Sequence, residues 1–381
     1  MGGVPLFPEG LALARPRFSN PTAIAREMER VVSSEVLTNG PTVRMLEERA
    51  AEYLGVRHCV AVASCTAGLM LVLRAADISG DVIVPSFTFA ATAHAVAWNG
   101  IRPVFADIDA DTLTLSPEAV DAVVGVRVSA ILATHVYGAP ADVEGLAEVA
   151  RRHGIGLFFD AAHGFGARHR GDMVGGFGAA EVFSLTPTKT LIAGEGGIIA
   201  TNDDLLAERC RIGRNYGNPG DYDCRFVGLN ARMSELHAVL ALASFEDLDE
   251  RIERRNELAA SFREAFSDIP GIAFPKVRPG DRSTYKDLTI LVSEPEFGMS
   301  ADGLGEALAA EGVETRRYYS PPVHRMRAYR SFGGVHLPAT EKAAAQALSL
   351  PLWTDMTPDH IERLAEAVLR IHTSVGVASS G

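Results

Sequence analysis

Lysine is scarce in this 381-residue sequence, although arginine is abundant. Lysine and arginine together number 36, and only four of these residues are lysine: Lys189, Lys276, Lys286 and Lys342. Lysine is normally exposed, so a lysine inside an uncharged segment of such a chain is a candidate for chemistry. Lys189 lies in the segment SLTPTKTLIAGEGG, which is flanked by proline and glycine and is almost free of charge.

Other shortages exclude whole classes of protein. The four cysteines have no CxxC spacing, so we expect reduced thiols and no metal site. No stretch approaches the roughly 20 uninterrupted apolar residues of a membrane-spanning helix. The first residues lack a basic start followed by an apolar core, so we expect no signal peptide and a cytoplasmic location.

Basic residues are also in deficit, and the formal net charge is −12. This charge argues against a general nucleic-acid binder, because such proteins need a basic face. It leaves a nucleotide-linked ligand open, since a few local arginines are enough for a diphosphate. The glycine-rich runs GGFG and GEGG lack the spacing of a P-loop or of a dinucleotide-binding turn.

Strand-like and helix-like patterns alternate along the first two thirds of the chain. Strands are expected near residues 58–63, 82–85, 103–107, 130–135, 157–159, 181–184 and 198–201. Helices are expected over residues 23–54 with a break at 38–41, and near 65–75, 90–98, 116–124, 142–153 and 203–214. This alternation indicates an α/β fold whose mainly parallel sheet is covered by helices on both faces.

The last third of the chain is expected to form a second unit. An amphipathic pattern over residues 233–266 predicts one long helix that connects a large domain, 1–245 with its N-terminal segment, to a small C-terminal α/β domain, 246–381. In the small domain we expect strands at 284–292 and 313–317 and helices at 301–311 and 358–371.

The segment from Gly156 to Thr201 holds the residues with the clearest chemistry. An apolar strand ends in Asp160, with His163 close behind, and Lys189 follows the next strand. Ligands of α/β proteins collect beyond the carboxyl ends of strands, so Asp160 and Lys189 are both well placed. A lysine that forms a Schiff base and an acid that keeps a ring nitrogen protonated together suggest pyridoxal phosphate. The alternative is an ordinary surface lysine on a loop.

The runs DAAH and FSLTPTKTLIAGEGG are similar to the paired signature of the DegT/DnrJ/EryC1/StrS family of sugar aminotransferases. The resemblance extends over nearly the whole chain and implies the fold-type I architecture of pyridoxal-phosphate enzymes. It implies that Lys189 carries the cofactor and that Asp160 pairs with the pyridine nitrogen. It also places His163 beside the ring and its 3-hydroxyl, where the family often has glutamine, and Ser184 at the phosphate.

Two further segments gain a role from this resemblance. The turn SCTAGL alone favours an ordinary capped helix start, but the resemblance implies that Cys65, Thr66 and Ala67 cradle the cofactor phosphate. An aromatic residue just past a strand is usually part of the core. The resemblance instead implies a ring that packs on the pyridoxal face, which we assign to Phe89 in preference to Phe87.

The resemblance also implies that two chains complete each site. Asn230 in GLNARMSE matches an asparagine that reaches the phosphate of the partner subunit, so a homodimer with shared active sites is expected. The run TRRYYSPPVHRMRAY matches a segment that borders the substrate. Its candidate substrate-binding residues are Arg316, Arg317, Tyr318, Tyr319 and His324, although several of these could be simple surface residues.

The expected function is therefore a pyridoxal-phosphate-dependent aminotransferase that takes an amino group from glutamate or glutamine. The acceptor would be a nucleotide-activated keto sugar, and the family pattern leans toward dTDP-4-keto-6-deoxyglucose giving dTDP-4-amino-4,6-dideoxyglucose in deoxyaminosugar and antibiotic biosynthesis. A 3-keto sugar nucleotide or a ketocyclitol of the scyllo-inosose type is the alternative acceptor. A deoxysugar dehydratase typically has histidine at the position of Lys189, and a non-catalytic sugar-nucleotide-binding homologue would have no need for Asp160, His163 and Lys189 together.

Overall fold

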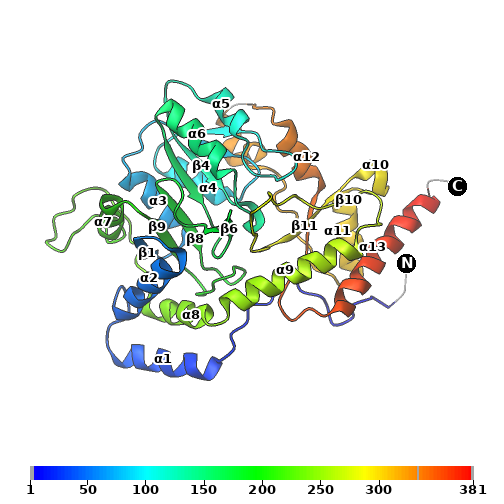
Figure 1. Ribbon diagram of the computed structural model, residues 1–381, viewed down its shortest axis with the longest axis horizontal. Helices are drawn as coiled ribbons and strands as arrows, with labels where there is room; N and C mark the ends of the chain where they lie inside the picture. The colour runs from blue at the N-terminus through cyan, green and yellow to red at the C-terminus, as the bar shows by residue number, and fades with distance from the viewer. Residues whose placement is uncertain (1–3, 333, 379–381) are drawn as a thin grey trace.

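The computed structural model describes residues 4–332 and 334–378, and its centre is a seven-stranded sheet (Figure 1). The strands lie in the order β1-β9-β8-β5-β4-β2-β3. Their bounds are β1 (His58–Val62), β2 (Asp81–Pro85), β3 (Pro103–Ala106), β4 (Val128–Thr134), β5 (Gly156–Asp160), β8 (Ala180–Ser184) and β9 (Gly197–Thr201). Strand β9 is antiparallel to both of its neighbours, and the other pairs are parallel. The prediction of a mainly parallel α/β sheet is confirmed.

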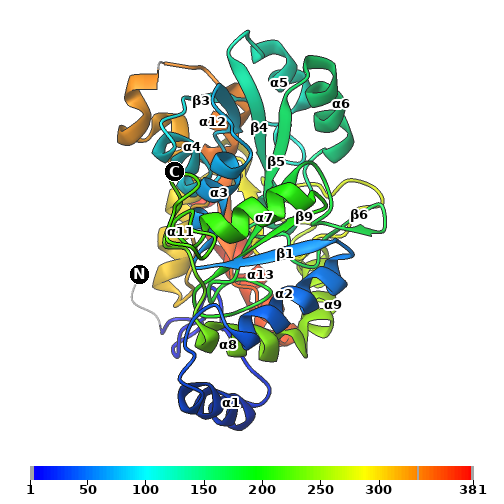
Figure 2. The ribbon, with the colours of Figure 1, turned by 90° about the vertical axis from the view of Figure 1, so that its left-hand side faces the viewer.

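Helices cover both faces of this sheet, which is why its strands are apolar on both sides (Figure 2). Alternate residues of β1 face opposite sides of the sheet: Val60 and Val62 pack in one hydrophobic cluster, and Cys59 and Ala61 pack in another. The first cluster includes residues of α3 (Cys65–Ala75), α4 (Ala90–Trp98) and α7 (Asp204–Gly213). The opposite face is covered by α2 (Pro41–Leu54), α8 (Glu235–Phe245), α5 (Pro117–Val123) and α6 (Val143–His153).

A smaller antiparallel sheet forms the second unit. It contains β10 (Ile272–Ala273), β11 (Leu288–Val292) and β12 (Ala347–Leu350), packed with α10 (Glu294–Phe297), α11 (Ala301–Ala310) and α13 (Pro358–Ala378). The expected strand at 313–317 is wrong. Val313 and Arg316 each make only an isolated bridge, with Leu11 and Ser349, because the chain then leaves this sheet for the larger unit. The expected strand at 284–292 begins only at Leu288.

The expected long helix over residues 233–266 is two helices. Helix α8 ends at Phe245, and α9 (Leu248–Ala265) begins after Asp247, whose φ of −110° and ψ of 12° are not helical. Ser244 stabilises the break, because its carbonyl and hydroxyl oxygens both accept hydrogen bonds from Arg251. The break lets α8 stay on the large sheet while the far end of α9 reaches the core of the small unit.

One segment of the C-terminal third returns to the large unit. Val323, Tyr329 and Leu337 share a hydrophobic cluster with α3 and α4. Helix α12 (Pro338–Gln346), which the sequence pattern missed, begins where Asp107 accepts hydrogen bonds from the backbone N–H groups of residues 339 and 340, at 3.0 and 2.8 Å. The division at residues 245 and 246 stays a prediction, and this segment ties the two units together.

The N-terminal helix α1 (Pro21–Ser33) lies at the edge of the molecule beside α8 (Figure 1). Among the described residues, none of the helices combines the length and the apolar character needed to cross a membrane.

A buried carboxylate fixes the start of α2. Glu235 accepts hydrogen bonds from the backbone N–H groups of Gly40, Thr42 and Val43, at 2.8 to 2.9 Å, although α2 and Glu235 are about half the chain apart. A Cβ on Gly40 would lie 2.6 Å from Val36 Cγ1 and 3.0 Å from Cδ of Glu235, so this turn leaves little room for a side chain. The carboxylate satisfies the free donors of the first helical turn and matches the positive end of the helix dipole.

Glu235→Ala would leave these buried N–H groups without a partner. We expect the free energy of unfolding to fall by about 2 to 4 kcal/mol, measured by urea unfolding at a fixed protein concentration. Glu208→Ala, at an exposed position of α7, is the control and should stay within about 0.5 kcal/mol of the parent. Equal losses in the two variants would contradict the capping role.

Candidate active site

Three of the predicted cofactor residues lie at or just beyond the carboxyl ends of neighbouring strands. Asp160 ends β5, Ser184 ends the adjacent β8, and Lys189 lies in the turn between β8 and β9. The register of β4 on β5 pairs Thr134 with Asp160, so the neighbouring strand contributes a hydroxyl at the same level. Parallel strands deliver these side chains to one edge of the sheet.

Asp160 is a buried carboxylate with ordered partners. Its Oδ2 accepts a hydrogen bond from the Thr92 hydroxyl at 2.7 Å, and its Oδ1 accepts one from the Ala162 N–H at 3.1 Å. Burial raises the pKa of Asp160, and these two donors together with the charge of Lys189 partly offset that rise. Each carboxylate oxygen can accept a further hydrogen bond, so the group can still receive a ligand N–H.

Threonine hydroxyls behind Asp160 form a small network that the sequence reasoning missed. The Thr88 hydroxyl lies 2.9 Å from that of Thr92 and 3.1 Å from that of Thr134. All three hydroxyl groups are buried, so the network fixes the orientation of the Asp160 carboxylate. The only sequence signal was the polar pair in SFTFAAT, which reads equally well as a helix start.

Lys189 is half-buried, and its ammonium group is unusually acidic. Burial lowers its pKa to about 8, and the charge of Lys286 contributes to the same direction, while Asp287, Cys65 and Asp160 oppose it. A larger share of Lys189 is therefore neutral near pH 7 than for an ordinary lysine, and the neutral amine is the form that attacks an aldehyde and accepts a proton.

His163 is a buried ring with an unused nitrogen. Its Nδ1 is buried and has no hydrogen-bond partner among the described residues. Burial and the charges of Lys189 and Lys286 hold the pKa of His163 well below its usual value. An unpartnered buried nitrogen is costly, so a ligand oxygen or N–H at this point would stabilise the site.

The predicted phosphate residues also come together. Helix α3 begins at Cys65, and the start of β9 lies so close to it that a Cβ on Gly197 would be 2.7 Å from the Cys65 nitrogen. Gly197 pairs with Ser184 across the sheet, which places the Ser184 hydroxyl beside the N-terminus of α3. The Ala67 N–H donates to Ser64 Oγ at 3.1 Å, so Cys65 and Thr66 offer the amides of the first turn that need a partner.

The two phenylalanines after β2 have opposite environments. Phe87 is fully buried and packs edge-on against Tyr137 and Tyr319. Phe89 is 62% exposed at the start of α4, which is unusual for a residue of this size. The assignment of Phe89 as the ring that covers the cofactor stays a prediction, and its exposure supports that assignment.

The predicted substrate residues are scattered. Arg316 is exposed and pairs with Glu314 at 2.7 Å, and Tyr318 is half-buried with its ring 5.2 Å from the Lys286 ammonium group. Tyr319 is buried and stacks on Tyr137. The side chains of His324 and Arg317 already have hydrogen-bond partners within the protein. His324 is buried with its ring nitrogens 2.6 Å from Ser86 and 3.3 Å from Glu341, and Arg317 donates to three backbone carbonyls at residues 344, 345 and 347.

Asn230 is exposed beside the same edge of the sheet. The carbonyl of its neighbour Ala231 accepts a hydrogen bond from the Ala63 N–H at 2.8 Å, two residues before α3 begins. The backbone of Asn230 is thus held near the phosphate residues, while its side chain lies on the surface.

These residues fit pyridoxal phosphate. Asp160 can pair with the cofactor's ring nitrogen, and Lys189, with its lowered pKa, can react with the aldehyde. The unpartnered nitrogen of His163 suits the ring oxygen, and the start of α3 suits the phosphate. Among the described residues, no group of three or more His, Cys, Asp or Glu side chains is placed to hold a metal ion. The fold and the site together define a fold-type I pyridoxal-phosphate enzyme.

The family model of the DegT/DnrJ/EryC1/StrS aminotransferase family matches residues 20–369, and the chain belongs to this family. The chain is 38% identical over 346 residues to the erythromycin biosynthesis sensory transduction protein EryC1 of Saccharopolyspora erythraea, covering 89% of this chain and 93% of the relative. It is 35% identical over 330 residues to the UDP-N-acetyl-3-dehydro-alpha-D-glucosamine 3-aminotransferase of Acidithiobacillus ferrooxidans, covering 86% and 88%.

A solved structure shows the same architecture. The crystal structure of DesI with its TDP-sugar product has a TM-score of 0.94 and 39% sequence identity, covering 100% of this chain and 97% of DesI. The predicted family, enzyme class and cofactor are thereby confirmed: the protein is a sugar aminotransferase that uses pyridoxal phosphate.

Proposed function

We propose that the protein transfers an amino group from glutamate or glutamine to a nucleotide-activated keto sugar, with dTDP-4-keto-6-deoxyglucose as the leading candidate. The observation that favours this class is the similarity to DesI over the whole chain, because DesI was crystallised with a TDP-sugar product. The product would be dTDP-4-amino-4,6-dideoxyglucose, an intermediate suited to deoxyaminosugar and antibiotic biosynthesis.

The proposed roles follow from the environment of each side chain. Bound pyridoxal phosphate supplies the electron sink of the reaction. Lys189 Nζ, with its pKa of about 8, would accept a proton from the α-carbon of the amino donor. It would later return a proton to the sugar carbon that receives the amino group. Asp160, whose oxygens are fixed by Thr92 and Ala162, keeps the proton on the ring nitrogen. His163 Nδ1 orients the ring through its oxygen.

A 3-keto sugar nucleotide is the second candidate acceptor, because a relative of 35% identity is named as a 3-aminotransferase of a UDP-linked sugar. A ketocyclitol such as scyllo-inosose is a third. The name of EryC1 describes a sensory protein, which corresponds to the non-catalytic alternative. The convergence of Asp160, His163 and Lys189 in one site favours catalysis over binding alone.

The acceptor can be identified by direct assay. We would incubate the purified protein with each keto compound and with glutamate or glutamine, and identify the aminated product by NMR. Amination of dTDP-4-keto-6-deoxyglucose at the highest kcat/KM supports the proposal. A higher kcat/KM for the UDP-linked 3-keto sugar or for scyllo-inosose would replace the acceptor, and no turnover of any compound would favour the binding-only alternative.

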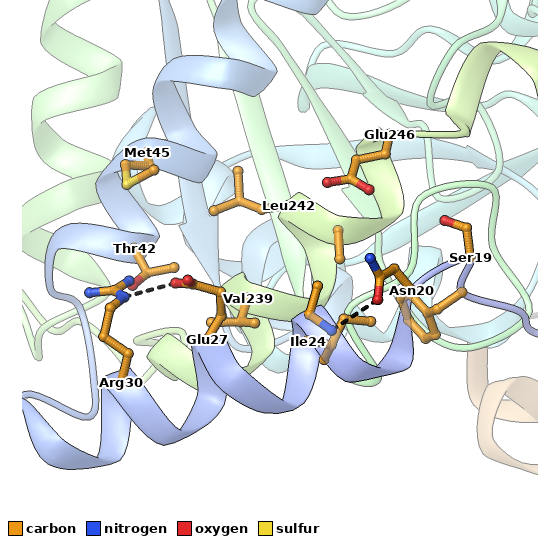
Figure 3. Close-up of a pocket in the computed structure, with 13 residues that line it drawn as sticks. Ser19, Asn20, Ile24, Glu27, Arg30, Thr42, Met45, Val239, Leu242 and Glu246 are labelled. Atoms are coloured by element: carbon orange, nitrogen blue, oxygen red, sulfur yellow. Dashed lines mark hydrogen bonds and ion pairs between the residues drawn. The ribbon is translucent and has the colours of Figure 1, made fainter.

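We also propose that the working unit is a homodimer in which Asn230 serves the partner's site. An open groove of about 220 Å³ lies between α1, α2 and α8 (Figure 3). Its apolar lining includes Ile24, Met45, Val239 and Leu242, as Figure 3 shows. A surface of this kind is typical of an interface between subunits.

The residues that follow Asn230 lie beside the segment that leads into α2, one of the helices that line the groove. The exposed Leu37 accepts a backbone hydrogen bond from Glu235 at 3.0 Å, and Asn39 donates one to Met233 at 3.1 Å. Val32, Val36, Leu37 and Met45 are between 45% and 59% exposed along the same side. A second copy seated here would cover these side chains and bring a partner chain to Asn230.

Mixing two inactive variants tests the shared site. If Asn230 acts across the interface, a dimer of one Lys189→Ala chain and one Asn230→Asp chain contains one doubly altered site and one intact site. Random mixing should therefore restore about a quarter of the parental activity, because half of the dimers are mixed. If Asn230 acts within its own chain, every site has one lesion and mixing restores nothing. A fully active monomer in sedimentation would also overturn the dimer.

A further inference from the structure

A second lysine and an aspartate lie buried in the active site. Lys286 Nζ is 2.7 Å from Asp287 Oδ1, and both side chains are only 5% exposed. The ammonium group also lies 5.2 Å from the ring centroid of Tyr318. Lys286 is also near enough to Lys189 for its charge to act on that residue, so two of the four lysines of the chain are neighbours.

The backbone around this pair is clamped by both units of the molecule. Thr284 donates from its N–H to the carbonyl of Gly138 at 3.1 Å and from its hydroxyl to the carbonyl of His163 at 2.7 Å. From the other side, Arg255 on α9 donates to the carbonyls of Tyr285 and Lys286 at 2.9 and 2.8 Å. The backbone that carries the pair is therefore fixed, and Thr284 just before it contacts the carbonyl of His163.

The pair is costly to bury. Two charges removed from water lose hydration that their mutual attraction only partly returns, and an apolar pair of similar volume is often at least as stable. Asp287 Oδ2 is buried without a hydrogen-bond partner among the described residues, which adds to the cost. An expensive pair at a rigid point of the active site indicates a role other than stability.

The charge of Lys286 reaches the reactive groups. It contributes to the lowered pKa values of Lys189 and of His163, whereas Asp287 acts on Lys189 in the opposite direction. Cys65 and Asp160 also face Lys189 and act in the same direction as Asp287. Four arginines line a cavity of about 30 Å³ next to the same residue: Arg15, Arg17, Arg251 and Arg255.

We propose that Lys286 and Asp287 are positioning residues for Lys189. The fixed ammonium group of Lys286 favours the neutral amine of Lys189, and Asp287 holds that ammonium group in place and limits its effect. The inference rests on the proposed function, since a neutral Lys189 is what proton transfer requires. It assigns a purpose to Lys286, the one lysine that is buried among the described residues, and it predicts opposite effects for two adjacent residues.

The scarcity of lysine makes a direct test simple. Trace acetylation of the full-length, cofactor-free protein with acetic anhydride, followed by mass spectrometry, measures the reactivity of each of the four lysines against pH. Only the neutral amine reacts, so Lys189 in the parent should reach half of its maximal reactivity near pH 8. The exposed Lys276, paired with Asp111, provides an internal reference.

Lys286→Met should move the Lys189 profile to higher pH and reduce its labelling at pH 7 about three- to tenfold. Lys286→Arg, which keeps the charge, should stay within about twofold of the parent. Asp287→Asn should move the profile to lower pH. Lys276→Met is the matched control and should leave Lys189 unchanged, because its side chain is 69% exposed.

A Lys286→Met chain that does not fold would be replaced by the double variant Lys286→Met/Asp287→Asn, which removes both charges and leaves neither buried alone. In that variant, the pH at which Lys189 reaches half of its maximal labelling should lie between the values for the two single variants. An unchanged Lys189 profile in folded Lys286→Met protein, or shifts of the same sign in both single variants, would overturn the inference. The expected shifts without amination of any keto compound would overturn the proposed function instead, and amination with an unchanged profile would overturn only the positioning role.

Discussion

Lys189→Ala should lose at least about a thousandfold in amination rate, because no other amine can both hold the cofactor and move the proton. The variant should still take up pyridoxal phosphate without a covalent link, since Asp160, His163 and the start of α3 remain. Borohydride reduction of the parent followed by peptide mapping should label Lys189 alone. Lys342→Ala, which alters an exposed lysine on α12, is the control and should keep both the label and the rate.

A label on Lys286 is the result that would contradict this assignment most directly. This lysine is buried in the same site, so a reduced cofactor found on Lys286 would show that the reactive lysine was assigned wrongly. A label on the exposed Lys276 or Lys342 would do the same. Because the chain has only four lysines, each outcome corresponds to one identifiable peptide.

Asp160→Asn should keep the covalent link to Lys189 but reduce the amination rate by at least about a hundredfold. The amide has nearly the shape of the carboxylate, so the fold should be retained, but it has no charge with which to hold a proton on the ring nitrogen. The rate would be followed in single turnovers, and retention of cofactor by absorbance.

The control for this substitution is Asp172→Asn, in the exposed hairpin of β6 (Arg168–His169) and β7 (Asp172–Met173), which should be without effect. Thr92→Val removes the hydroxyl that donates to Asp160 at 2.7 Å and should give a smaller loss of rate. A near-normal rate for Asp160→Asn would show that the carboxylate is structural.

Much of the fold could be predicted because its signals are local. Strands that are buried on both faces are continuous apolar runs, and the caps Ser64, Asp142 and Asp203 each begin a helix with a side-chain hydrogen bond. The expected helix over 233–266 failed because its break depends on Ser244, whose oxygens bond to Arg251. The expected strand at 313–317 failed because pairing partners of a strand are not visible in its own residues.

The candidate site also has some residues with a local sequence signal and others without one. By itself, the sequence pointed to Asp160 and Lys189, since a polar residue soon after an apolar strand lies at the ligand-binding edge of a parallel α/β sheet, and the family resemblance added His163. Only the tertiary structure decided which distant side chains surround them: Thr92 on Asp160, Lys286 and Asp287 beside Lys189, and His324 turned into the core against Ser86. Burial and the charges of side chains from distant parts of the chain act on the pKa of Lys189, and no local pattern encodes those contacts.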